Sequence, residues 1–174
     1  FFNTIYAAYI NKTTDNECFT IGVPILNRTT PEEMDTIGLY MHPVPLVIKI
    51  KEESFIESAK RIEDSQINLF RHQKFTQADM ENLFEENNID TTQLFDVVSD
   101  FQEFPCTEDF EMKILYSNHL PTPIEIHLQS FDEKNHNIKI RYRTSYLDDN
   151  EAKTMIDSIV NMMKYVCDNP NAII

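Results

Sequence analysis

The chain has 174 residues, enough for one domain with its own core, and its 41% hydrophobic and 25% charged residues are typical of a globular protein. Its 15 basic and 29 acidic residues give a net charge of −14, which repels phosphate backbones and anionic lipids, so binding to nucleic acid or membranes is not expected. The 3 cysteines form no C-x-x-C pair, so neither a zinc site nor a disulfide framework is expected, and a cytoplasmic location fits.

The first half of the chain is predicted to alternate helices with short extended segments. Hydrophobic periodicity predicts a helix over 1–10, strands over 18–23 and 44–50, and helices over 54–70 and 76–86. A further short helix is predicted between the two strands, because Thr30 can cap it and Pro31 suits its first position. Ser54 is the expected cap of the helix that follows.

The second half of the chain is predicted to be mostly strands, closed by one helix. The predicted elements are strands over 94–101, 110–116, 124–129 and 138–143, and a helix over about 150–167. In the last two strands, apolar residues alternate with polar ones, which predicts a hairpin with one buried face. For each pair of residues that lie opposite each other in this hairpin, the two residue numbers should add up to an even number. In this register, exposed acidic residues of one strand lie opposite exposed basic residues of the other. Asp149 is the expected cap of the last helix.

The order of these elements predicts an α/β (α+β) sandwich, in which a mixed, mostly antiparallel sheet carries helices packed on one face. The chain has no initiator Met, and it opens with Phe1-Phe2 already in an apolar pattern. We therefore expect it to be part of a longer polypeptide.

The segment from Ile21 to Leu46 holds both glycines of the chain and four of its eight prolines. Gly22 follows an apolar run, where it allows a close backbone approach or an unusual φ at the end of a strand. Pro24 removes a backbone donor, so the chain there is not expected in the middle of a sheet. Neither Gly22 nor Gly38 stands in a phosphate-binding loop pattern, so a nucleotide site is not expected.

The same segment resembles a conserved part of the condensation domains of nonribosomal peptide synthetases. In that family, a Gly-Thr-Pro segment ends in Gly-Arg-Thr, and an Ile-Gly-x-Phe-Val-Asn-Thr-Leu-Pro-Leu-Arg motif follows. Here the first segment is Gly22-Val23-Pro24 through Asn27-Arg28-Thr29, and the second runs from Ile37-Gly38 to Leu46-Val47. Further along, His72-Gln73 and a strand that ends in Phe101-Gln102 match the family in the expected order.

The resemblance implies a chloramphenicol-acetyltransferase-like fold, of which this chain is one lobe. It implies that residues 1–174 are a single domain, the C-terminal lobe of a condensation domain, with a linker to the next domain starting over 168–174. The catalytic His-His-x-x-x-Asp-Gly motif of the family belongs to the N-terminal lobe. The five histidines of this chain are isolated, and none precedes an Asp-Gly, so no catalytic residue is assigned here.

The resemblance also implies an activity and partners. In the family, the amine of one carrier-bound aminoacyl group attacks the thioester of another, and phosphopantetheine arms bring both into a tunnel between the lobes. The implied partners are an N-terminal condensation lobe, donor and acceptor peptidyl carrier proteins and a downstream adenylation domain. The residues placed on the tunnel side by resemblance are Gly22, Pro24, Arg28, His42 and Gln102.

Several positions depart from the family pattern. His42 stands in place of Asn, Pro43 in place of Thr, and Val47 in place of the closing Arg. Two other interpretations therefore stay open: a non-catalytic module that docks carrier proteins, and a coenzyme A-dependent acyltransferase of the same fold. In all three interpretations, the chain by itself is expected to be inactive.

Overall fold

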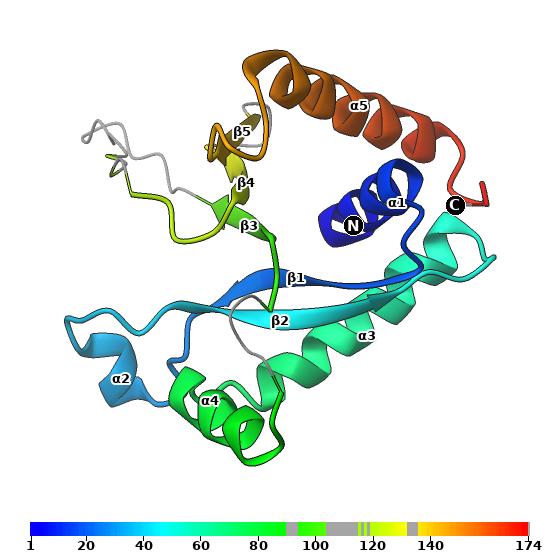
Figure 1. Ribbon diagram of the computed structural model, residues 1–174. Coiled ribbons are helices and arrows are strands. Elements are labelled where there is room, and N and C mark those ends of the chain that lie inside the picture. The colour runs from blue at the N-terminus through cyan, green and yellow to red at the C-terminus, as the bar shows by residue number, and fades with distance from the viewer. Residues whose placement is uncertain (90–93, 104–114, 116, 118, 132–135, 174) are drawn as a thin grey trace.

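The computed structural model describes residues 1–89, 94–103, 115, 117, 119–131 and 136–173. These residues form five strands and five helices around one strongly coiled sheet (Figure 1). In chain order the elements are α1 (Phe2–Thr14), β1 (Cys18–Ile25), α2 (Pro31–Asp35), β2 (His42–Lys49), α3 (Phe55–Arg71), α4 (Gln77–Glu86), β3 (Val97–Glu103), β4 (Ile124–Ser130), β5 (His136–Tyr142) and α5 (Asp149–Asp168). Of the predicted elements, the strand over 110–116 lies, except for Leu115, outside the described residues.

The sheet has the strand order β2-β1-β3-β4-β5. The two outer pairs, β1–β2 and β4–β5, are antiparallel, whereas β3 runs parallel to both of its neighbours. The predicted hairpin register is confirmed, because Ile124 pairs with Tyr142 and Ile126 with Ile140. The predicted fold class, a mixed sheet with helices, is confirmed as well.

Side-chain caps explain where four of the five described helices begin, α1 being the exception. Thr30, Ser54 and Thr76 each start a helix with a reciprocal capping box, in which the third helical residue is acidic and bonds back to the cap. The last helix begins one residue earlier than predicted. Its cap is Asp148, whose carboxylate accepts from the backbone of Asn150 and Glu151, and the prediction of Asp149 was wrong.

Helices α1, α3 and α5 form a layer on one face of the sheet (Figure 1). Helix α1 lies between the two others and contributes to both core clusters. Ile5 and Tyr6 pack with Ile126 and Ile159, whereas Ala7 packs in the cluster around β1, β2 and α3. The predicted helix over 1–10 is therefore confirmed, but it is buried on more than one side and extends to Thr14.

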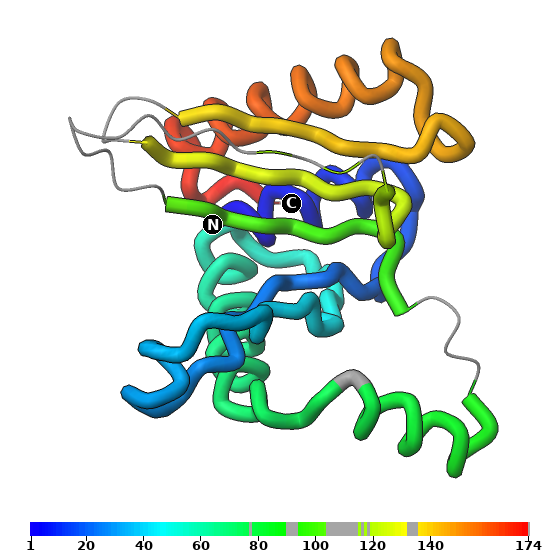
Figure 2. The backbone as a smooth tube through the Cα atoms, turned by 90° about the vertical axis from the view of Figure 1, so that its left-hand side faces the viewer, coloured from blue at the N-terminus to red at the C-terminus, as the bar shows by residue number. Residues whose placement is uncertain are grey.

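Strand alternation divides the sheet into two faces. The core face carries Val23 and Ile126 and meets the helix layer. The second face carries Gly22, Val98 and Glu125. Val98 of β3 pairs with Gly22 of β1 on one side and with Glu125 of β4 on the other. Figure 2 looks onto this second face, with β3, β4 and β5 in front of α1.

Among the residues that the structure describes, one residue pair joins the two halves of the sheet. There, β1 and β3 pair only at Gly22 and Val98, and beyond that point they diverge (Figure 2). Pro24 lies past the junction and pairs with Pro43 of β2 alone. Pro24 is therefore part of β1, but it has a paired neighbour on only one side, which agrees with the expectation that the chain at Pro24 is not in the middle of a sheet.

The end of the chain packs against the start of α3. The backbone of Phe55 donates to the Ala172 carbonyl at 2.8 Å, and Ile56 donates to the Pro170 carbonyl at 3.1 Å. Ile173 also forms an isolated bridge with Ser54. Residues 170–173 thus contact the start of α3, and the linker that the resemblance implies from 168–174 onward stays a prediction. No helix within the described ranges is long and apolar enough to cross a bilayer.

Candidate functional site

The candidate site is built around the junction at Gly22. A Cβ atom at this position would lie 2.5 Å from Phe95 Cε2 and 2.8 Å from Val98 Cγ2. The sequence left two reasons for a glycine here, a close backbone approach or an unusual φ. The close approach is confirmed by these distances, and the unusual φ is excluded because Gly22 has no positive φ. Thr20 reinforces the junction, since its hydroxyl donates to the Leu94 carbonyl.

A surface poor in hydrogen-bond donors lies beside the junction. By register, Pro24, Pro43, Pro45 and Val47 share the second face of the β1–β2 ribbon with Gly22. Val47 is 53% exposed, and the three prolines on this face are half-buried or exposed. Three prolines without a backbone N–H, together with an exposed valine, make this surface beside the junction apolar.

Gln102 lies on the second face near the end of β3, where a chain of polar side chains starts. Its Nε2 donates to Asp100 Oδ2 at 2.6 Å, and its Oε1 accepts from Gln129 Nε2 at 3.3 Å. His127 Nδ1 lies 3.1 Å from the same Asp100 oxygen. Side chains from two strands therefore fix the orientation of the Gln102 amide.

The chain of polar side chains continues across β4 and β5. His127 Nε2 lies 3.4 Å from Glu125 Oε2, and Arg141 Nη1 donates to the same oxygen at 2.7 Å. The predicted pairing of an acid on one strand with a base on the other is thus confirmed. The expectation that these positions are exposed was wrong, because Glu125, His127 and Gln129 are 8%, 8% and 5% exposed.

Arg28 organises the connection between β1 and β2. Its guanidinium donates to the carbonyl oxygens of Glu33, Thr36 and Gly38, and it lies 4.2 Å from the centroid of the Tyr40 ring. A planar fork of donors suits several carbonyl groups at once, and its face suits an aromatic ring. These contacts make Arg28 a clamp that holds the loop around α2.

His42 opens β2 and pairs with Ile25. It therefore lies on the core face of the sheet, together with Val44 and Leu46. Its Nδ1 lies 3.3 Å from the Tyr40 carbonyl oxygen, while its buried Nε2 has no hydrogen-bond partner within the described part of the chain. A buried ring nitrogen without a hydrogen-bond partner is available to a water molecule or a polar group of a ligand.

The five residues selected from the sequence thus occupy three places. Gly22, Pro24 and Gln102 share the second face of the sheet, on the two sides of its opening. Arg28 clamps the adjoining loop, and His42 lies on the opposite face. The period of two over His42, Val44, Leu46 and Ile48 was the signal in the sequence that could have placed the histidine there.

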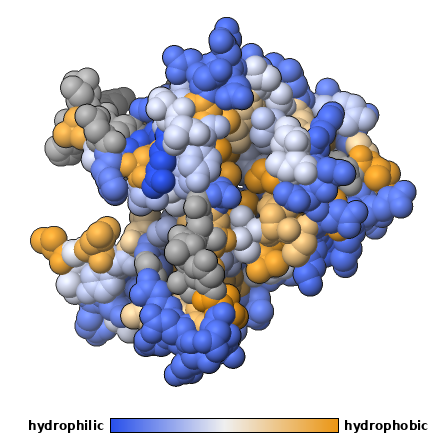
Figure 3. All heavy atoms as spheres, viewed as in Figure 1, coloured by the Kyte–Doolittle hydropathy of each residue, from blue (hydrophilic) through white to orange (hydrophobic). Residues whose placement is uncertain are grey.

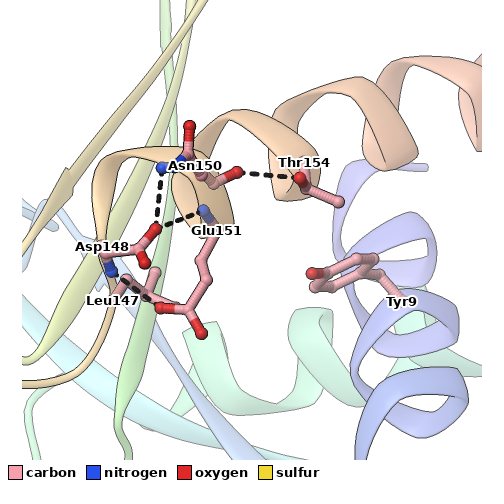
Figure 4. A pocket seen from close by; sticks show the side chains of 6 residues that line it. All are labelled: Tyr9, Leu147, Asp148, Asn150, Glu151 and Thr154. Atoms are coloured by element: carbon pink, nitrogen blue, oxygen red, sulfur yellow. Dashed lines mark hydrogen bonds between the residues drawn. The ribbon is translucent and has the colours of Figure 1, made fainter.

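The hollows on the helix layer lie apart from these residues. One cavity of about 340 Å³ is lined by Tyr9 and the start of α5 (Figure 4). Several of its polar groups are already bonded, since Asp148 accepts from two backbone amides in the helix cap and Thr154 donates to the Asn150 carbonyl. A groove of about 810 Å³ runs between α1 and α5. Among the residues that the structure describes, no group of side chains is suited to hold a metal ion.

Comparisons with known proteins identify relatives for the whole chain. The family model of the condensation domain matches residues 1–174. Surfactin synthase subunit 1 of Bacillus subtilis (strain 168) is 23% identical over 175 residues, which cover 97% of this chain and 5% of that protein. Bacitracin synthase 2 of Bacillus licheniformis is also 23% identical, over 95% of this chain and 7% of its own length. The chain therefore corresponds to a small part of these relatives.

Solved structures share the fold at low sequence identity. The condensation domain of the monacolin K polyketide synthase MokA superposes with a TM-score of 0.80 at 15% identity, over 99% of this chain and 42% of that one. The first condensation domain of the CDA synthetase gives a TM-score of 0.83 at 16% identity, over 99% and 39%. The X-domain from teicoplanin biosynthesis gives 0.80 at 12% identity, over 99% and 42%.

Proposed function

This chain belongs to the condensation-domain family, and we propose that it is the C-terminal lobe of such a domain in a nonribosomal peptide synthetase. The observation that carries the proposal is how much of each solved condensation-domain chain this chain covers. The family match spans residues 1–174, yet the chain accounts for only 42% and 39% of two solved condensation-domain chains. A chain that is one lobe of a two-lobed domain is expected to match along its whole length, while it covers less than half of a solved chain that contains both lobes.

In this proposal, the complete domain forms an amide bond between two carrier-bound substrates. The acceptor amine attacks the thioester carbon of the donor, a C–N bond forms, the C–S bond breaks, and the donor arm leaves as a thiol. The amine loses a proton in the same process, which requires a base. This chain has only isolated histidines, so the base comes from the N-terminal lobe.

The second face of the sheet is the surface we assign to the tunnel. Pro24, Pro43, Pro45 and Val47 supply an apolar wall at the opening between β1 and β3. Gln102, held by Asp100 and Gln129, supplies an oriented amide on the other side. Phosphopantetheine arms consist of apolar stretches between amides, so one apolar wall and one fixed amide fit such an arm. Arg28 serves the same site indirectly, because it positions the adjoining loop.

Reconstitution tests the assignment. The purified chain is mixed with donor and acceptor carriers loaded with aminoacyl thioesters, and products on the acceptor are analysed by mass spectrometry. We expect no amide product from the chain alone and amide formation once the preceding segment of the parent polypeptide is added. Amide formation by the isolated chain would contradict the proposal, as would a complete domain that stays inactive with all carriers loaded.

A second candidate is a condensation-like module that docks other proteins without catalysis. The departures at His42, Pro43 and Val47 favour it, and a solved complex of the X-domain and OxyB from teicoplanin biosynthesis contains a domain of similar fold. The same reconstitution separates the candidates. Carrier binding without any amide product from the complete domain supports docking, whereas product formation supports condensation.

A further inference from the structure

The polar side chains that join β3 to β4 lie in a largely buried part of the second face. We call four of them, which contact one another in sequence, the β3–β4 polar network: Gln102, Asp100, His127 and Glu125. The Asp100 and His127 side chains are only 12% and 10% exposed. A buried charged network is often no more stabilising than apolar side chains of the same size would be. Its presence here therefore points to a use other than stability.

Asp100 determines which end of the Gln102 amide faces which neighbour. An ionised carboxylate only accepts hydrogen bonds, so the Gln102 atom that lies 2.6 Å from Asp100 Oδ2 is the donor Nε2. The other end of the amide, Oε1, then accepts from Gln129 Nε2 at 3.3 Å. A reversed amide would set an oxygen against the carboxylate and an NH₂ group against the NH₂ group of Gln129. Asp100 therefore fixes the polarity of the amide as well as its position.

The Asp100 carboxylate is itself held from neighbouring strands. His127 Nδ1 lies 3.1 Å from the same Asp100 oxygen, and it is the donor because the carboxylate accepts. The other ring nitrogen lies 3.4 Å from Glu125 Oε2, which also accepts from Arg141 of β5 at 2.7 Å. Side chains of β3, β4 and β5 thus hold Asp100 in one orientation.

The two bonds of Gln102 leave half of its amide for a ligand. A glutamine amide has two N–H donors and two acceptor lone pairs. Among the described residues, Gln102 uses one N–H on Asp100 and one lone pair on Gln129, and it is half-buried. One N–H and one lone pair remain, in directions that these bonds set. An indentation borders this side of the molecule, between the part that carries β3, β4 and β5 and the part that carries α2 (Figure 3).

We propose that Asp100 is a positioning residue of the condensation reaction. It holds the Gln102 amide in the polarity in which the remaining N–H and lone pair bond one amide group of a phosphopantetheine arm. An arm amide offers the complementary pair, a carbonyl oxygen and an N–H, so both bonds can form at once. A freely rotating amide would have to be ordered on binding, which costs affinity. The inference rests on the proposed function, because it requires that the second face lines the tunnel.

Steady-state kinetics of the complete condensation domain test whether Asp100 acts through Gln102. Both carriers are loaded with single amino acids, which have no amide of their own, so the arms supply the only amides of the substrates. Asp100→Ala and Gln102→Ala should each raise the KM for one carrier about 3- to 10-fold and change kcat less, because a bond made on binding is lost. The double variant should lose no more than Gln102→Ala alone. Additive losses would overturn the proposal, since Asp100 would then act independently of Gln102.

Two further variants separate positioning from the loss of a charge. Asp100→Asn keeps an acceptor oxygen in the same place and should restore most of the wild-type KM. Glu103→Gln removes a carboxylate from an exposed position on the opposite face of β3 and should leave the KM unchanged. Circular dichroism verifies that all variants are folded. Equal losses in Asp100→Asn and Asp100→Ala would contradict the claim that an acceptor oxygen at this position orients the amide.

NMR of the chain tests the geometry without carriers. The side-chain NH₂ signal of Gln102 is assigned by its loss in Gln102→Ala. In the wild type, one of its two protons should be shifted downfield and exchange slowly with water, because it donates to a carboxylate. Asp100→Ala should move both protons to the positions of a free glutamine, and Glu103→Gln should leave them in place. A wild-type signal at the free position would overturn the proposal.

The outcomes separate this inference from the proposed function. If the complete domain forms the amide product and folded Asp100→Ala keeps the wild-type KM and kcat, the positioning role is wrong while the proposed function stands. If the complete domain forms no product with both carriers loaded, the proposed function fails, and the positioning role fails with it even where NMR shows the bond between Asp100 and Gln102. A raised KM that disappears in the Gln102→Ala background supports both.

Discussion

The ring of Phe95 fills the space into which a side chain at Gly22 would project. A Cβ atom built there would lie 2.5 Å from Phe95 Cε2 and 2.7 Å from Cδ2, closer than real Cβ contacts come. Gly22 also forms the only pair between β1 and β3 among the described residues, opposite Val98. The two halves of the sheet therefore meet at a position where only a glycine fits without rearrangement.

Gly22→Ala should destabilise the fold by about 1–3 kcal/mol, because Phe95 and Val98 must move to admit the methyl group. Urea unfolding followed by circular dichroism measures the change in the free energy of unfolding. Gly38→Ala is the matched control, since a Cβ there meets only the ring of Tyr40, at 3.3 Å, and the position is exposed. Equal stability losses in the two variants would show that the close approach at Gly22 is not what requires a glycine.

The ion pair between Glu125 and Arg141 should contribute to stability because it is largely buried. The Glu125 side chain is 11% exposed and that of Arg141 is 20% exposed. Arg141→Ala should cost about 1–3 kcal/mol, since it leaves a carboxylate with one partner fewer in a poorly solvated site. In a double-mutant cycle, Glu125→Ala combined with Arg141→Ala should lose less than the sum of the single variants. Strict additivity would mean that the two side chains do not interact.

Much of the fold was predictable because local signals dominate there. Capping residues fixed the starts of three helices, and the alternation of isoleucine with polar residues fixed the register of the hairpin. The error at the last helix has a local cause. Asp148 and Asp149 are both good caps, and the choice between them depends on Glu151, which bonds back to the backbone of Asp148 at 2.7 Å.

The candidate site was less predictable because it depends on pairing between distant strands. Alternation identified Glu125 and His127 as one face of β4, but a period of two does not tell whether that face meets water. Their burial depends on Asp100 and Arg141, which come from neighbouring strands and supply polar partners for His127 and Glu125. The clamp at Arg28 was also hidden, since its acceptors are backbone carbonyls and side-chain identity does not reveal them.

The cap of α5 gives a direct comparison of neighbouring aspartates. Asp148→Ala should cost about 1 kcal/mol, because the carboxylate accepts from the backbone of Asn150 and Glu151, both at 2.8 Å. The control is Asp157→Ala in the exposed part of the same helix, which should change stability by no more than about 0.5 kcal/mol. Thermal unfolding of both variants measures the difference. A larger loss at Asp157 would contradict the assignment of the cap.

The pH dependence of the loop around α2 should follow Glu33. Hydrogen bonds from Lys74 and from the backbone and hydroxyl of Thr29 and the backbone of Thr30 lower the pKa of Glu33 to about 2, from an ordinary value of 4.5. A carboxyl group with a lower pKa in the folded state stabilises that state fully above its unfolded pKa. The stabilisation then declines as the pH falls from about 4.5 through 2, and it is lost below that, where Glu33 is protonated in both states.

The test is a titration of the Glu33 carboxyl signal by NMR in the wild-type chain, with a midpoint expected near pH 2. In Lys74→Gln, which removes the largest cause of the shift, the midpoint should rise towards 4.5, because the ammonium no longer favours the charged carboxylate. Lys60→Gln removes the same charge from α3 and should leave the midpoint where it is. A wild-type midpoint near 4.5 would mean that Lys74 does not hold Glu33, and the loop around α2 would lose one of its two ties.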